Sequence, residues 1–284
     1  MRALAEFIMR GRAQATVVAL IGSWFPLISP ATVALVSLRR GVSDGVIILL
    51  WAALPALIAL VISDIGPLMT MVTIAGLATT FVAGLVLRLN ASWAQTLIGM
   101  VAMASFSGLI LAWAEPDPVA GVTNALGDML TQMQAQAPGN AEVFTPSVTF
   151  VVGLVCYVIA VNSMLSLFLA RWWQAALYNP GGFQSEFHQL RLNPVQALLC
   201  LAAVLYSWQQ GGDYHTWGSL FGLPLLISGV ALVHFTVKAR NFGGQWLVLF
   251  YLALLLVNPL TLVLMAVATL DTWINFRARI APKT

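Results

Sequence analysis

The side chains best suited to acid–base chemistry or metal binding are three histidines, and the sequence keeps them apart. His188, His215 and His234 fall in three different segments, which we assign to three different depths. No His-Glu-x-x-His, Cys-x-x-Cys, Walker or Gly-x-Ser-x-Gly pattern accompanies them. We therefore expect no metal site and no other cofactor, and we expect a protein that is not an enzyme.

A few polar side chains fall inside apolar segments, where ionisable groups are candidates for function. Asp271 is close enough to the end of its segment to pair with Lys238 or an arginine. A hydrogen bond between helices is the alternative role for such groups, and a position in the interfacial aromatic belt is the alternative for tryptophans. The residues that we predict to contact a small metabolite are Trp24, Trp51, Asn162, Ser166 and His234.

The composition indicates that the elements holding these side chains lie in a membrane. Hydrophobic residues make up 60% of the 284 residues, charged residues only 8%, and the mean hydropathy is +0.89. Because a soluble protein carries about 25% charged residues, the chain is predicted to lie in a bilayer. The 13 Lys and Arg residues are scattered along the chain. This distribution is typical of charges that set the orientation of a membrane protein, and not of a nucleic-acid-binding surface. Cys156 and Cys200 lie in apolar runs, where we expect inert thiols.

A helix that crosses the bilayer needs roughly 20 apolar residues. The clear candidates are residues 46–62, 67–87, 93–114, 148–170, 194–208 and 217–237. Two more runs, 16–38 and 246–276, carry prolines near the middle. The sequence thus predicts an all-α polytopic transmembrane helical bundle of about 8 to 10 membrane segments, some of them short or re-entrant, in one domain (1–284).

Loop charges predict the orientation, because cytoplasmic loops carry the excess of Lys and Arg. No basic residue occurs between Arg88 and Arg171, and the connection 114–146 between the corresponding spans is acidic. We therefore expect 114–146 on the periplasmic side of a bacterial inner membrane and both termini in the cytoplasm. The basic N-terminal segment has no cleavage site after its apolar stretch, so we expect it to be retained.

This orientation places both ends of 16–38, and both ends of 246–276, in the cytoplasm. We interpret the first run as a hairpin that turns between Pro26 and Pro30, and the second as a hairpin that turns at Asn258-Pro259. A single long, tilted helix is the alternative for either run.

The periplasmic connection contains a predicted amphipathic helix over residues 117–136. Its apolar side chains share one helical face, and they are Val119, Val122, Leu126, Met129 and Met133. We favour a cap over the bundle, and a lid over a substrate is the alternative.

The cytoplasmic connection 171–193, here called the elbow, has the densest set of functional side-chain types. Trp172 and Trp173 are typical of a belt at the level of the lipid headgroups, and Asn-Pro-Gly-Gly at 179–182 predicts a turn. The elbow is interpreted either as an interfacial anchor or as a docking surface. The elbow residues predicted to contact a partner are Arg171, Trp172, Trp173, Asn179, Gly181, Gly182, Phe183, Glu186, Phe187 and Arg191.

The N-terminal part of the chain combines a short first helix with Ala15 and Ala19, a proline-bearing turn, a second short helix that ends in Leu-Arg-Arg-Gly (38–41), and Gly45. With these features, residues 1–113 resemble the substrate-binding S-components of energy-coupling-factor transporters. The whole chain, with LYNPGGFQSEF (177–187) and LDTWINFR (270–277), resembles the YybS-like family of bacterial polytopic membrane proteins, which is distantly similar to S-components.

The likeness to S-components implies a membrane-embedded pocket for a small metabolite and a coupling subunit that packs on Ala15 and Ala19. The alternative is a membrane scaffold or assembly factor that binds a protein partner through the elbow. We thus expect contact with membrane lipids. A membrane coupling subunit, a cytoplasmic protein and a small metabolite are further candidate partners, and we expect no binding of nucleic acid.

Overall fold

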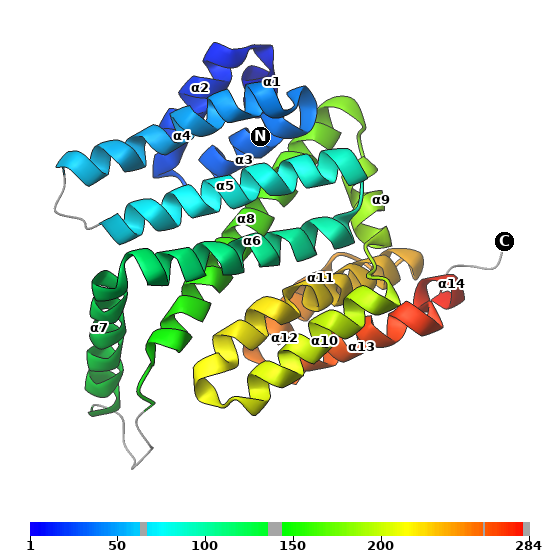
Figure 1. The fold of residues 1–284 in the computed structure, drawn as a ribbon. Coiled ribbons are helices and arrows are strands. Elements are labelled where there is room, and N and C mark those ends of the chain that lie inside the picture. Colours follow the sequence, from blue (N-terminus) through cyan, green and yellow to red (C-terminus); the bar gives the residue numbers. More distant parts are fainter. Residues whose placement is uncertain (63–66, 136–143, 258, 281–284) are drawn as a thin grey trace.

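The computed structural model describes residues 1–62, 67–135, 144–257 and 259–280, which form an all-α bundle without a strand (Figure 1). Asn258, at which the second hairpin is predicted to turn, lies outside these ranges. The elements are α1 (Arg2–Arg10), α2 (Arg12–Ile21), η1 (Gly22–Trp24), α3 (Ile28–Arg40), α4 (Val42–Ile62), α5 (Pro67–Asn90), α6 (Trp93–Ala114), α7 (Pro116–Ala135), α8 (Val148–Tyr178), α9 (Gly182–Gln189), α10 (Pro194–Gln209), η2 (Gly212–Tyr214), α11 (His215–Ala239), α12 (Gln245–Leu256), α13 (Pro259–Ile274) and α14 (Phe276–Ile280).

Five segments of the described chain are long and apolar enough to cross a membrane. They are α4, α5, α6, α8 and the segment Gly212–Ala239, which contains α11. The count becomes seven if α9 with α10, and α12 with α13, are each taken as one bent span. The all-α class is confirmed, but the prediction of 8 to 10 membrane segments is too high. The limbs of the two folded-back runs have 10 to 16 residues, whereas a crossing needs roughly 20.

The N-terminal run folds back on itself, as the sequence predicts. At 1.5 Å per residue, α2 is about 15 Å long and α3 about 20 Å, so neither helix spans a hydrocarbon layer of about 30 Å. The turn between them lies against α4, α5 and α8. Every residue from 31 to 38 is buried, so α3 is enclosed by the rest of the protein.

Helix α8 connects the two halves of the bundle, because it contacts α3, α5 and α6 as well as α11. It has 31 residues and continues to Tyr178, past the predicted end at residue 170. The helix ends before Pro180, and a residue that precedes proline disfavours helical geometry. Trp173 is fully buried inside the protein. The interpretation of Trp173 as a headgroup-level belt residue is therefore wrong.

The elbow folds as a tight turn followed by a short helix. Gly181 has a φ of +84°, which glycine adopts without strain, and α9 begins at the next residue. The axes of α9 and α10 meet at a bend of 69°. The predicted turn at 179–182 is confirmed, and α9 contacts α11.

The second folded-back run consists of α12 and α13, which meet at a bend of 116°. Pro259 is the first residue of α13, a position where proline is favourable because no hydrogen bond is lost. No residue of α12 is buried, so this helix lies at the edge of the bundle.

Helices α7 and α9 lie at opposite ends of the bundle (Figure 1). The predicted amphipathic helix is confirmed as α7, which packs on α6 and α8. Val119 is buried, but Val122, Met129 and Met133 are exposed. Three residues of the predicted apolar face of α7 are thus exposed, Leu126 is half-buried, and the helix covers the bundle with Val119 and Thr123.

Candidate functional site

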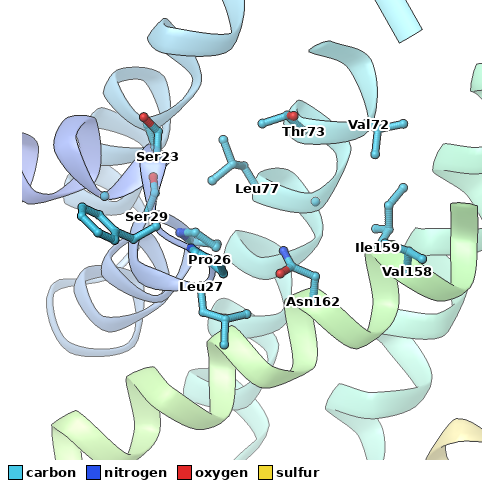
Figure 2. A pocket seen from close by; sticks show the side chains of 15 residues that line it. Ser23, Pro26, Leu27, Ser29, Val72, Thr73, Leu77, Val158, Ile159 and Asn162 are labelled. Atoms are coloured by element: carbon cyan, nitrogen blue, oxygen red, sulfur yellow. The ribbon is translucent and has the colours of Figure 1, made fainter. Parts of the chain in front are cut away.

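The turn of the N-terminal hairpin forms one wall of a cavity of about 250 Å³, here called the hairpin cavity (Figure 2). The other walls come from α4, α5 and α8. Phe25, Pro26 and Leu27 belong to no helix and all contact the cavity. Phe25 and Pro26 are exposed and Leu27 is half-buried, so the turn borders the cavity at the surface of the protein.

The polar atom that stands out in this cavity is the hydroxyl of Ser29. The residue is only 3% exposed, and its Oγ has no hydrogen-bond partner. A buried polar group without a partner costs about 1–3 kcal/mol, and the great majority of buried polar groups in native proteins have a partner. A bound solute that accepts or donates one hydrogen bond would remove this cost.

Asn162 faces the same space from α8 (Figure 2). Its carboxamide makes no hydrogen bond to a described side chain or backbone group, whereas the cavity hydroxyls of Ser23 and Thr73 donate to Leu20 O at 2.7 Å and Met69 O at 2.8 Å. The carboxamide offers two donors and one acceptor. Ser29 and Asn162 therefore supply the free hydrogen-bonding groups of the cavity.

The amino end of α3 adds a third polar feature to the cavity. Leu27 precedes the helix with a φ of +70°, and no side chain caps the first turn. The first N–H groups of a helix carry partial positive charge. In α3, Ile28 N donates to Phe25 O at 3.4 Å and Pro30 has no N–H, so the N–H of Ser29 is the donor of the first turn that faces no backbone acceptor. Non-glycine residues with positive φ are strained and occur preferentially at functional sites.

These groups suit binding better than catalysis. The cavity is lined by no Asp, Glu, His, Lys or Arg, so no lining side chain can act as a general acid or base near neutral pH. Its volume is below the roughly 300–1,000 Å³ of pockets for drug-sized ligands. The arrangement fits a small solute with a neutral or anionic hydrogen-bonding group.

A second, larger cavity of about 870 Å³ lies beside the elbow, between α8, α9, α11 and α12, and is here called the elbow cavity. His234 and Tyr251 Oη are 2.7 Å apart at its wall. The rings of His188 and His234 lie 6.5 Å apart. The prediction that the histidines sit at three different depths is wrong for this pair, because α9 packs against α11. Burial lowers the pKa of His188, and the positive charges of Lys238 and Arg277 lower it further.

The residues predicted to contact a metabolite do not form one site. Asn162 lines the hairpin cavity and His234 the elbow cavity. Ser166 is buried and donates to Asn162 O of its own helix at 2.7 Å. Trp24 is 83% exposed and Trp51 44% exposed, and neither lines one of these two cavities. Their exposure is compatible with the alternative role as interfacial aromatics.

The elbow is held to the bundle by its acidic residue and its aromatic face. Glu186 accepts hydrogen bonds from Arg171 Nε at 2.9 Å and from Trp93 Nε1 at 3.3 Å. Phe183 and Phe187 both pack on Phe168, with ring centroids 5.9 and 5.6 Å away. Both phenylalanines are therefore half-buried against α8, and both also line the elbow cavity.

The other predicted partner contacts divide between the surface and the interior. Asn179 and Gly181 are exposed at the turn and Gly182 is half-buried, and Trp172 is 44% exposed. Ala15 and Ala19 are buried, because α2 packs against α1, α3 and α4. In this structure the small-residue face of α2 serves packing within the chain.

Asp271 pairs with an arginine, as predicted, and the arginine is Arg277. Arg277 also donates to His188 O at 2.8 Å and to Leu190 O at 2.7 Å, and Arg191 donates to Thr272 O at 3.2 Å. These bonds join the end of the chain to the elbow. Sequence reasoning did not predict this junction, because its acceptors are backbone carbonyls.

Sequence reasoning also did not single out Ser29 and Tyr251. Ser29 stands between two prolines of a hairpin turn, and that position was the signal that could have marked it. Tyr251 had no such signal in an apolar helix.

Comparison of the chain with protein-family models, with curated proteins and with solved structures gives no match. The class of the protein therefore rests on its own features. Long apolar helices in an all-α bundle define an integral membrane protein.

Proposed function

We propose that this membrane protein binds a small polar solute in the hairpin cavity, as the binding or transport subunit of S-component type that the N-terminal resemblance implies. The unpaired, buried hydroxyl of Ser29 is the observation that carries the proposal. The carboxamide of Asn162 and the uncapped start of α3 support it. Half-helix N-termini near the middle of a membrane are used by transporters to bind anionic substrate groups.

The test begins with purification of the full chain in mild detergent and mass spectrometry of the small molecules that accompany it. We expect a solute smaller than a drug-sized ligand, and we expect members of a vitamin and nucleobase panel to raise the midpoint of thermal unfolding. A preparation that carries no solute and shows no thermal shift contradicts the proposal.

Substitution of Ser29 by alanine separates binding from stability. Ser29→Ala is expected to weaken solute binding by about tenfold, which corresponds to one lost hydrogen bond. The solute-free protein should be as stable as before or more stable, because an unpaired buried hydroxyl is removed. Calorimetric titration and thermal unfolding of the same samples measure the two effects.

Ser166→Ala is the matched control, because Ser166 is also a buried serine but its hydroxyl is already bonded within α8. Its solute affinity should stay at the level of the unmodified chain. Equal loss of affinity in both variants would place the solute elsewhere.

The proposed orientation has an independent test in intact cells. In a variant without Cys156 and Cys200, Asp128→Cys should react with a thiol reagent that cannot cross the membrane, and Pro180→Cys should not. Both positions are exposed, so the difference reports the side of the membrane. Arg39→Cys should also stay unlabelled. Labelling of residues 128 and 180 from the same side would refute the orientation.

A further inference from the structure

The elbow cavity has no part in the proposed solute site, yet it is the larger of the two cavities. Its volume of about 870 Å³ falls in the range of ligand pockets. Four helices bound it, and Arg2 of α1 stands at its edge.

The cavity has a polar end and an apolar end. The polar side chains of the lining include Arg2 of α1, Gln184 and His188 of the elbow, and His234 of α11. Leu226 precedes His234 by eight residues, which is about 12 Å along α11, and Met164 lines the same deep region from α8. This division matches a molecule with a polar headgroup and an apolar chain.

Among the described lining residues, Arg2 is the one Lys or Arg, and its Nε is paired with Glu6 Oε1 at 2.9 Å. The cavity is lined by no Asp or Glu, and the nearby carboxylate of Glu186 is bonded to Arg171 and Trp93. Lys238 and Arg277 act on His188 from α11 and α14. The lining thus has no carboxylate of its own, and an anionic headgroup at Arg2 would replace the exposed Glu6 as the partner of this arginine.

Helix α12 indicates where the apolar part of the ligand comes from. It has no buried residue. Its described hydrogen bond to the cavity wall joins Tyr251 Oη to His234 Nε2 of α11. Close packing leaves few voids larger than a water molecule inside proteins, so a cavity of this size beside a bilayer has to be filled. The bilayer supplies acyl chains to a helix at the edge of the bundle.

We propose that the elbow cavity binds one anionic phospholipid of the adjoining leaflet. One acyl chain lies between α8, α11 and α12, and the phosphate lies near Arg2 and His188. Basic pockets between transmembrane helices bind the headgroups of anionic lipids in this way.

The experiment compares phosphatidylglycerol with phosphatidylcholine on the delipidated full chain in detergent. Native mass spectrometry should show one retained phosphatidylglycerol, and this lipid should raise the unfolding midpoint more than phosphatidylcholine does. Arg2→Gln should weaken phosphatidylglycerol binding by about fivefold. This side chain is 69% exposed, so the variant is expected to fold.

Arg10→Gln is the matched control, because Arg10 is an exposed arginine of the same helix that does not line the cavity. It should leave lipid binding unchanged. Val230→Phe, which fills the apolar wall, should reduce binding of the lipid without changing solute binding in the hairpin cavity. Equal binding of both lipids, equal effects of the two arginine variants, or a bound protein or metabolite in place of the lipid would overturn the proposal.

Discussion

Substitution of Asp271 by alanine is expected to lower the midpoint of thermal unfolding by on the order of 10 °C. The carboxylate is fully buried, accepts from Phe276 N at 2.7 Å and pairs with Arg277. Removal of one partner of a buried ion pair costs about 3–5 kcal/mol, because the other charge remains without compensation. The guanidinium of Arg277 is itself only 11% exposed.

The exposed pair of Arg2 and Glu6 provides the control. Its side chains are 69% and 47% exposed, and surface pairs contribute about 0–1 kcal/mol. Glu6→Ala should therefore shift the midpoint little. The double variant Asp271→Ala/Arg277→Leu should be more stable than the sum of the single losses predicts, because no unpaired charge remains. Similar shifts for Glu6→Ala and Asp271→Ala would show that the buried pair does not stabilise the elbow junction.

The folded-back N-terminal run was predictable because two independent signals agree. Pro26 and Pro30 interrupt the apolar run, and arginines flank both of its ends. Prolines cannot continue a helix without losing a backbone bond, and charges at both ends on one side require a return of the chain. The structure forms α2 and α3 at these positions.

The end of α8 was not predictable by the same means. Arg171, Trp172 and Trp173 have the composition of an interfacial belt, but composition does not reveal whether another helix covers them. Helices α1 and α3 pack on α8, and Trp173 is fully buried. Packing by other helices makes Trp173 a core residue and not a belt residue. The sequence pattern of α8 alone does not show which helices pack on it.

The candidate site was predicted only in part, since Asn162 was identified and Ser29 was not. A cavity between four separate segments depends on their relative placement, which charge and hydropathy do not determine. The prediction that His188 and His234 lie at different depths failed for a related reason. A bend of 69° at the elbow changes the depth of every residue in α9, and the sequence indicates a turn there without its angle.

The contact between α11 and α13 leads to the second large expected effect, which is destabilisation by Gly229→Ala. A Cβ at residue 229 would lie 2.7 Å from Leu264 O and 3.1 Å from its carbonyl carbon. Small residues allow such close approach of helix backbones in membranes. Because backbone atoms cannot rotate away, α13 has to move, and overpacking of this kind costs about 1–3 kcal/mol.

Gly99→Ala is the matched control in α6, since nothing lies within 4 Å of a Cβ at that position. Alanine favours a helix more than glycine does, so this variant should be as stable as the unmodified chain or slightly more stable. Thermal unfolding of both variants in the same detergent measures the difference. Because α13 carries Asp271 toward the elbow, Gly229→Ala should also weaken the Asp271–Arg277 junction, and its effect should be less than additive with that of Asp271→Ala. Fully additive losses, or equal midpoints for Gly229→Ala and Gly99→Ala, would show that α13 does not approach α11 as closely as the structure has it.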